Sequence, residues 1–204
     1  MTARDTAKPA RCAWAGDDPL YQHYHDTEWG VPHADDQRLF EKLVLEGFQA
    51  GLSWITILRK RENFRRAFHG FDAKKIARYT ERDVARLMAD EGIIRNRLKI
   101  EATISNAEAY LALKTQGTLA GFLWAALGKR EPLSVRRAMG DIPPVTDEAA
   151  KLSKALKKAG FRFVGPTSMY AFMQSTGMVN DHLVGCPRHA ACAKLQRAFV
   201  PPVV

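Results

Sequence analysis

The chain has 204 residues, of which 46% are hydrophobic and 26% are charged. This length and composition suit a folded domain with a sizeable core, and they exclude a chain that is disordered throughout. No apolar run approaches the roughly 18 residues needed to cross a membrane, and residues 1–11 lack the apolar stretch of a signal peptide. We therefore expect a cytoplasmic protein without a membrane partner.

Charge and cysteine content narrow the class of protein further. Lys and Arg number 31 against 22 Asp and Glu, which gives a formal net charge of +9. This excess favours a polyanionic partner, nucleic acid first of all, although a merely basic protein fits the charge equally well. The three cysteines, an odd number, argue against a disulfide framework and leave free thiols or metal ligands.

Helical patterns dominate the chain. Asp35 stands before an apolar face over residues 39–44, as at a helix start. Thr80 is placed to cap a helix that stops near Gly92, and another helical pattern runs over residues 100–111. These signals predict a helix in each of the three stretches.

The second half of the chain continues in the same way. Asp147 opens a helix that ends near Gly160, and a further helix is expected between Pro166 and Gly177. Residues 161–164 alternate as a strand does, but this stretch is short and isolated. We predict an all-α protein with about eight to ten helices, from typical helix lengths.

Two of the predicted helices meet across a very short connection around Gly92. Glycine permits a tight turn there, and the second helix would point its first N–H groups at solvent, which makes an anion site. Arg95, Arg97 and Lys99 cluster beside that helix start. The pattern suits a clamp on one DNA phosphate, but from sequence alone an ordinary helical hairpin with a solvated basic end is the commoner explanation.

Two pairs of potential metal ligands lie near opposite ends of the chain. Cys12 and His25 form the first pair, and His182 and Cys186, with three residues between them, form the second. Two thiolates and two imidazoles would complete the tetrahedral shell of a structural zinc and leave no position for a catalytic water. Spacing alone leaves rival ligands open, namely His23, His33, His189 and Cys192.

Aromatic and acidic residues gather in two segments. Tyr21, Tyr24 and His25 fall on one helix face, where rings could stack on a base or fill a core. Glu46 lies among apolar residues, where a carboxylate is costly unless it is paired or functional. The alternative role for Glu46 is a buried helix cap or a partner in an ion pair. Leu52 follows a glycine and could insert as a wedge into a stack of bases.

The chain resembles the Tag-type DNA-3-methyladenine glycosylases over about residues 11–187. The resemblance is carried by Trp14 and by four segments, residues 17–32, 45–72, 92–100 and 160–186. It implies a helix-hairpin-helix fold and a monofunctional repair enzyme. Such an enzyme flips 3-methyladenine out of double-stranded alkylated DNA and hydrolyses its N-glycosidic bond without cleaving the strand. A monomer suffices for this activity.

The resemblance also implies where the functional residues lie. The structural zinc falls on Cys12, His25, His182 and Cys186, and it ties the two ends of a glycosylase domain over residues 12–187 together. The base-contacting carboxylate falls on Glu46, and the base-binding rings on Tyr21, Tyr24 and Trp54, with Trp14 and Trp29 close by. DNA contacts fall on Gly51, Leu52, Gly92, Arg95, Arg97 and Lys99.

Departures from the family pattern and rival functions remain. The wider superfamily usually has a catalytic aspartate beyond the hairpin, and here Asp141 and Asp147 stand in plain polar contexts. Residues 1–11 are predicted to be a flexible tail, and the tail over residues 188–204 departs from the family pattern. Two other functions remain as alternatives: a reader of alkylated DNA without turnover, and a zinc-stabilised DNA-binding module.

Overall fold

The protein is described here by a computed structural model that covers residues 11–128 and 135–202. These segments form ten α-helices and three short 3-10 helices, and they contain no strand beyond one isolated bridge. The predicted all-α fold is confirmed. None of the helices in these segments is long and apolar enough to cross a membrane. The predicted flexible tail lies outside the described residues, except for Arg11.

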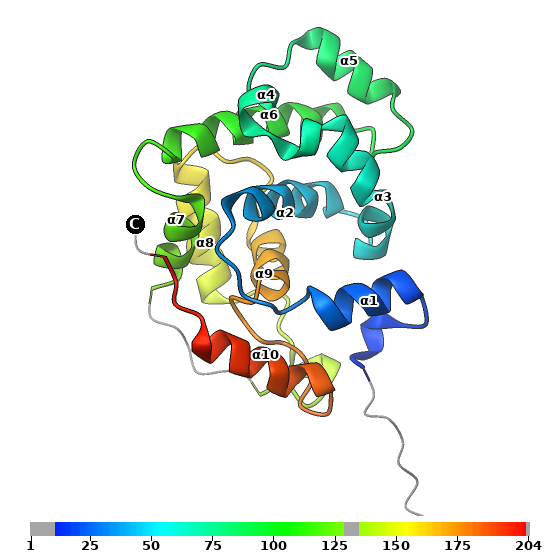
Figure 1. Cartoon of the computed structure of the whole chain (residues 1–204), viewed down its shortest axis with the longest axis vertical. Coiled ribbons are helices and arrows are strands. Elements are labelled where there is room, and N and C mark those ends of the chain that lie inside the picture. The colour runs from blue at the N-terminus through cyan, green and yellow to red at the C-terminus, as the bar shows by residue number, and fades with distance from the viewer. Residues whose placement is uncertain (1–10, 129–134, 203–204) are drawn as a thin grey trace, which may run out of the picture. The chain divides into compact units, whose positions relative to one another are not determined.

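Figure 1 shows the helices in chain order. The α-helices are α1 (Pro19–Thr27), α2 (Asp36–Gln49), α3 (Trp54–Ala67), α4 (Ala73–Ile76), α5 (Glu81–Ala89), α6 (Arg97–Leu113), α7 (Leu119–Leu127), α8 (Asp147–Lys158), α9 (Pro166–Ser175) and α10 (Pro187–Ala198). The 3-10 helices are η1 (Ala13–Ala15), η2 (His69–Phe71) and η3 (Met139–Asp141).

Side-chain hydrogen bonds cap the N-terminal ends of several of these helices. The Asp35 carboxylate accepts from the backbone N–H of Arg38 at 2.9 Å, which begins α2 where the sequence predicts it. At α5, Asp83 accepts from the backbone N–H of Thr80 at 2.9 Å and completes a capping box. The alternating residues 161–164 form no strand, because the chain turns at Phe163, whose φ is 55°.

The chain divides into two compact units, and each is described by itself. The second unit consists of Ala34–Arg130, Pro144–Met173 and Val200–Val204. Within it α2 packs against α3, α6 and α7. The Asp36 carboxylate on α2 accepts from the backbone N–H of Ala120 at 2.9 Å, so it caps α7 as well as standing in the first turn of its own helix.

The first unit consists of Met1–His33, Glu131–Pro143 and Gln174–Phe199. Its described residues include α1, η1, η3 and α10. Helix α10 forms from most of the segment that the sequence predicts as a C-terminal tail. Gln196 on α10 is buried, and it donates to the carbonyl oxygens of Gly177 and Val179 at 2.9 and 3.0 Å. These bonds bring part of the predicted tail into the fold of this unit.

The connection between α5 and α6 is short, as predicted, but glycine is favoured at position 92 for a different reason. Its φ is not among the positive values that favour glycine. A Cβ at this position would instead lie 2.8 Å from Oδ1 of Asp90, which accepts from the Gly92 N–H at 2.7 Å. Close approach, rather than backbone freedom, therefore explains the glycine. Asn96 then caps α6 by accepting from the N–H of Lys99 at 3.1 Å.

Candidate functional site

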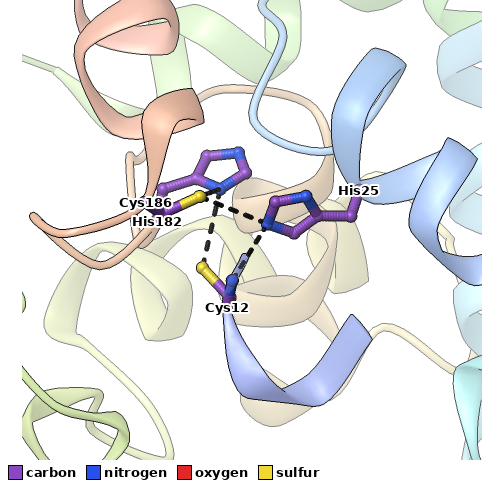
Figure 2. Close-up of side chains that lie close together, drawn as sticks. All are labelled: Cys12, His25, His182 and Cys186. Atoms are coloured by element: carbon purple, nitrogen blue, oxygen red, sulfur yellow. Dashed lines mark hydrogen bonds between the residues drawn. The ribbon is translucent and has the colours of Figure 1, made fainter. Parts of the chain in front are cut away.

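Four side chains of the first unit, Cys12, His25, His182 and Cys186, converge in its interior and are called here the metal cluster (Figure 2). All four are buried, and their ligand atoms lie within 4.8 Å of one another. Cys12 lies just before η1, His25 on α1, and the other pair just before α10. Every ligand that the sequence predicts is therefore in place.

The spacing of the ligand atoms fits a tetrahedral metal ion. Sulfur ligands at about 2.3 Å and imidazole nitrogens at about 2.1 Å from such an ion lie about 3.6 Å apart. Here Cys186 Sγ is 3.5 Å from His25 Nε2 and 3.7 Å from His182 Nδ1, and Cys12 Sγ is also 3.7 Å from His182 Nδ1. These three separations match that value, and no two of the four ligand atoms are more than 4.8 Å apart, so the cluster could hold a metal ion.

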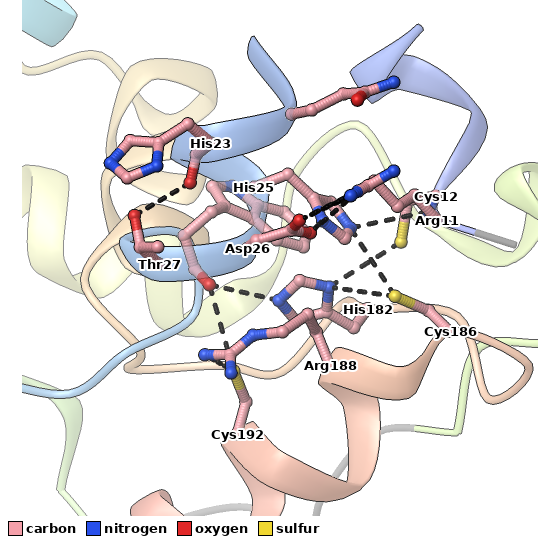
Figure 3. Close-up of polar contacts among 12 residues, drawn as sticks. Arg11, Cys12, His23, His25, Asp26, Thr27, His182, Cys186, Arg188 and Cys192 are labelled. Atoms are coloured by element: carbon pink, nitrogen blue, oxygen red, sulfur yellow. Dashed lines mark hydrogen bonds and ion pairs between the residues drawn. The ribbon is translucent and has the colours of Figure 1, made fainter. Parts of the chain in front are cut away.

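The other nitrogen of each histidine ring is hydrogen-bonded in a way that turns a lone pair toward the cluster. His182 Nε2 donates to the carbonyl oxygen of Trp29 at 3.0 Å. His25 Nδ1 lies 2.8 Å from the carboxylate of Asp26, which in turn accepts from Arg11 at 2.8–3.0 Å (Figure 3). Such outer partners fix the tautomer of a metal-binding histidine. Arg11, predicted to lie in the tail, instead belongs to this outer shell.

The two thiols have opposite proton affinities. A hydrogen bond from Cys12 lowers the pKa of Cys186 to about 2, and the same contact raises the pKa of Cys12. The backbone N–H of Leu183 also donates to Cys12 Sγ, at 3.4 Å. The lowered pKa of Cys186 favours its thiolate, which is the form of cysteine that binds metal ions.

The rival ligands lie outside the cluster. Among the described residues, the single group that could hold a metal ion contains none of His23, His33, His189 or Cys192. Cys192 is buried, and its sulfur accepts from Arg188 at 3.6 Å and lies 3.8 Å from the carbonyl oxygen of Trp29 (Figure 3).

Aromatic rings surround the histidines of the metal cluster. Trp14 lies at the centre of this group, with its ring centroid 4.9 Å from Tyr21 and 5.0 Å from Trp29. Trp29 contacts the ring of His182 at 4.6 Å. Tyr24 and Trp29 are buried, whereas Trp14 and Tyr21 are half-buried. Tyr21 and Tyr24, which are predicted to bind a base, contact Trp14, and the Trp14 ring lies 5.2 Å from the ring of His25. The metal cluster therefore supports these two tyrosines through Trp14.

A second polar group lies in the second unit and is called here the carboxylate site: Lys42, Glu46 and Trp54. Glu46 on α2 is 3% exposed, and its Oε1 lies 2.9 Å from Lys42 Nζ, one turn earlier on the helix. Its Oε2 is buried and has no hydrogen-bond partner among the described residues. The same Lys42 Nζ lies 3.2 Å from the centroid of the Trp54 ring, at the start of α3. A buried carboxylate oxygen without a donor is costly in a fold.

The connection between α2 and α3 exposes Leu52, the residue predicted to act as a wedge. Gly51 has a φ of +84°, which favours glycine, and Leu52 beside it is 41% exposed. Lys99 of α6 holds this turn from within, because its ammonium donates to the carbonyl oxygens of Phe48 and Ala50 at 2.8 and 2.7 Å. Burial lowers the pKa of Lys99.

The position of Lys99 corrects its predicted role. The sequence places it with Arg95 and Arg97 as a surface cation for a phosphate, but it is 8% exposed and directed into the fold. The two arginines are exposed, as expected. Arg97 pairs with Glu81 at 2.8 Å, and Arg95 with Glu91 at 3.5 Å. Exposed pairs of this kind are weak and exchange readily for another anion.

Sequence reasoning missed Lys42. It lies four residues before Glu46 on the same helix, the spacing at which opposite charges meet. A lysine at that spacing from a carboxylate in an apolar helix was the available signal.

Comparisons with known proteins agree with this geometry. Residues 14–189 match the family described as methyladenine glycosylase. DNA-3-methyladenine glycosylase 1 of Escherichia coli (strain K12) is 52% identical over 177 residues, covering 86% of this chain and 95% of that protein. A crystal structure of 3-methyladenine DNA glycosylase I (TAG) superposes with a TM-score of 0.86 at 51% identity, over 88% of this chain and all of that one.

A structure on 3-methyladenine recognition by the Staphylococcus aureus enzyme of the same name gives a TM-score of 0.83 at 38% identity. It covers 87% of this chain and 95% of that one.

Proposed function

This chain belongs to the methyladenine glycosylase family, and from that premise we propose that it releases 3-methyladenine from double-stranded alkylated DNA. It is a glycosylase, an enzyme that hydrolyses N-glycosidic bonds. The names of its relatives support the choice of 3-methyladenine as the base. The proposal includes flipping of the base, action as a monomer, and no cleavage of the strand.

The observation that carries the proposal is the unpartnered Oε2 of Glu46. A buried acceptor of this kind is retained at a cost, so a ligand donor is expected to reach it. The exocyclic amino group of a flipped adenine is such a donor. The negative charge also favours a base that methylation at N3 has made cationic, and the nearby Trp54 ring favours the same cation by about 0.5–2 kcal/mol.

Cleavage of this glycosidic bond needs little assistance from a catalytic side chain. A cationic base is a good leaving group, so the C1′–N bond is already weakened, and flipping a damaged base costs only about a few kcal/mol. The main tasks are therefore to extrude the base, to select it and to admit water. The Lys42 ammonium pairs with Glu46 and that of Lys99 with two carbonyl oxygens. Neither amine is placed as a nucleophile, which supports release without strand cleavage.

The aromatic residues and the turn complete the proposed roles. Tyr21, Tyr24 and Trp54 bind the base, and Trp14 and Trp29 hold those of the first unit in position; ring contacts within that unit support this. The exposed Leu52 on its glycine turn fills the space that the base leaves.

We propose that the connection between α5 and α6 binds a phosphate of the DNA backbone, as a helix-hairpin-helix motif does. The start of α6 offers N–H groups to a phosphate. Arg95 and Arg97 add positive charge there without reading sequence. Their exposure and weak ion pairs support this role, and Gly92 leaves room for the Asp90 side chain in the connection between the helices.

We assign a structural zinc ion to Cys12, His25, His182 and Cys186. Two sulfurs and two ring nitrogens are the ligands that zinc prefers in closed sites. When bound, the ion supplies folding free energy and takes no part in the reaction, since four protein ligands leave no place for water.

The direct test is to incubate methylated duplex DNA with the purified protein and to identify the released bases by chromatography. We expect free 3-methyladenine and intact strands, and much less release by Glu46→Gln. Binding to methylated DNA without release would favour the alternative of a reader. Glu46→Gln protein with full release would remove Glu46 from this account.

A further inference from the structure

Lys42 makes, within the protein, the two contacts that the proposed function gives to a cationic base. Its ammonium lies 2.9 Å from Glu46 Oε1 and 3.2 Å from the centroid of the Trp54 ring. The Lys42 side chain is only 13% exposed. A positive charge therefore already occupies the carboxylate and the ring face in this structure.

These contacts and a stacked base exclude each other. An ammonium 3.2 Å from the ring centroid covers the face on which a purine would stack. Trp54 is 8% exposed, which leaves little open ring surface elsewhere. A base that stacks on this face must first move the lysine.

We propose that Lys42 is a resident cation, which holds the Glu46–Trp54 position until a damaged base displaces it and which returns when the product leaves. The inference rests on the proposed function of this pair. Exchange of one cation for another leaves the charge at Glu46 balanced. A neutral base must displace the same lysine and brings no charge in return, so it binds weakly.

The reaction itself weakens the base as a competitor of Lys42 for Glu46 and Trp54. Hydrolysis breaks the C1′–N bond of the cationic nucleotide, and the electron pair of that bond goes to the base. Water adds to C1′ and releases one proton. The free 3-methyladenine is therefore neutral, and it no longer competes for Glu46 as a cation does. The return of the ammonium then expels the product.

The test measures inhibition of base release by added 3-methyladenine. Lys42→Met keeps the length of the side chain and removes its charge, so we expect the inhibition constant to fall about tenfold, the loss of one cation–π contact and one ion pair. Lys42→Arg retains a cation and should stay within about twofold of the wild type. Lys154→Met, an exposed lysine on α8, controls for loss of charge and should change nothing.

Tighter binding of 3-methyladenine after loss of the ammonium group is not what a merely structural lysine would give. An unchanged or higher inhibition constant in Lys42→Met overturns the inference and leaves Lys42 as a residue that only positions Glu46. Wild-type protein that releases no 3-methyladenine contradicts the proposed function and this inference together. Release by the wild type with an unchanged constant in the variant contradicts the Lys42 inference alone.

A second measurement needs no variant. The ring current of Trp54 should shift the ε-methylene protons of Lys42 upfield in the nuclear magnetic resonance spectrum of the free protein. Titration with 3-methyladenine should return these signals toward the ordinary lysine position. Signals that stay upfield at saturation would show that Lys42 keeps its place beside the base, and the inference would then be wrong.

Discussion

The metal cluster and the carboxylate site both bury polar groups, but they satisfy them in opposite ways. In the metal cluster the outward-facing nitrogen of each histidine is already bonded, to Asp26 and to the Trp29 carbonyl. The other nitrogen of each ring lies with the two cysteine sulfurs, all four atoms being within 4.8 Å of one another. In the carboxylate site one oxygen of Glu46 is paired with Lys42, and the other has no donor among the described residues.

The difference distinguishes a permanent ligand from a transient one. A site whose ligands converge and whose outer shell is complete is suited to an ion that stays bound. A site with one unpartnered acceptor beside a displaceable cation is suited to a ligand that enters and leaves. Substitutions in the metal cluster should therefore affect folding, and substitutions in the carboxylate site should affect activity.

Metal removal is the strongest test of the first half of this comparison. A structural zinc contributes on the order of 10 kcal/mol of binding free energy, comparable to the whole stability of a typical domain. We expect Cys186→Ser, or prolonged treatment with a chelator, to unfold the first unit. Metal analysis and thermal unfolding by circular dichroism check this.

The matched control for that experiment is Cys192→Ala, which removes a buried sulfur outside the cluster. It should retain one zinc per chain and lose only about 1 kcal/mol of stability. Wild-type protein with no stoichiometric metal, or Cys186→Ser protein with an unchanged unfolding temperature, would contradict a structural zinc in the metal cluster.

Glu46→Gln should show the reverse pattern. Loss of the charge that favours the cationic base should slow 3-methyladenine release about 10²–10³-fold, the range seen when one polar group that stabilises a transition state is removed. The free energy of unfolding should fall far less than in Cys186→Ser, because Glu46 Oε2 has no donor and the amide oxygen of the introduced glutamine can still accept from Lys42. Release rates and urea unfolding measure the two effects, and Glu108→Gln, an exposed residue on α6, is the control.

Lys99→Met tests a residue that should affect both folding and activity. Lys99 is buried like the residues of the metal cluster, but it holds the turn that carries Leu52. The variant leaves the carbonyl oxygens of Phe48 and Ala50 without their donor, at a cost of about 1–3 kcal/mol each. We expect reduced stability in urea together with slower base release. Full activity in Lys99→Met would show that the turn needs no support from α6.

The smallest expected effect concerns the exposed cations. Replacing Arg95 by Ala should weaken binding to all DNA sequences equally and reduce the slope of log affinity against log salt by about 1. Fluorescence anisotropy at several salt concentrations measures that slope. An unchanged slope for Arg95→Ala and for Arg97→Ala would contradict the proposed phosphate clamp, and Arg82→Ala, an exposed position on α5, provides a comparison.

Local signals predicted the fold well where they depended on neighbours in sequence. The caps at Asp35 and Thr80 stand where the polar residue precedes an apolar face, because a cap is formed within one helical turn. The sequence prediction omits α10 although Pro187 offers a local start signal, and the contacts of Gln196 with Gly177 and Val179 that hold this helix in its unit need the folded chain. The sequence predicts that Gly92 permits a tight turn, whereas in the structure its lack of a side chain leaves room for Asp90, a contact that no local pattern shows.

The sites show the same limit. Spacing left several histidines and cysteines open as metal ligands, and only the resemblance to a family selected four of them. Lys99 was misread because the sequence shows that it is a cation near a helix start, and not which way it points. Glu46 was found from its apolar surroundings, whereas its partnership with Lys42 needed the helix geometry.

The metal cluster joins residues that are far apart along the chain, Cys12 and His182 being 170 positions from each other. At ordinary rates of synthesis the ribosome needs roughly 10–30 s to make the segment between them. Cys12 and His25 therefore leave the ribosome long before their partners exist. The nascent chain can close its first unit only after most of the second has been synthesised, and a truncated product that stops before His182 would remain unclosed however much metal the cell supplies.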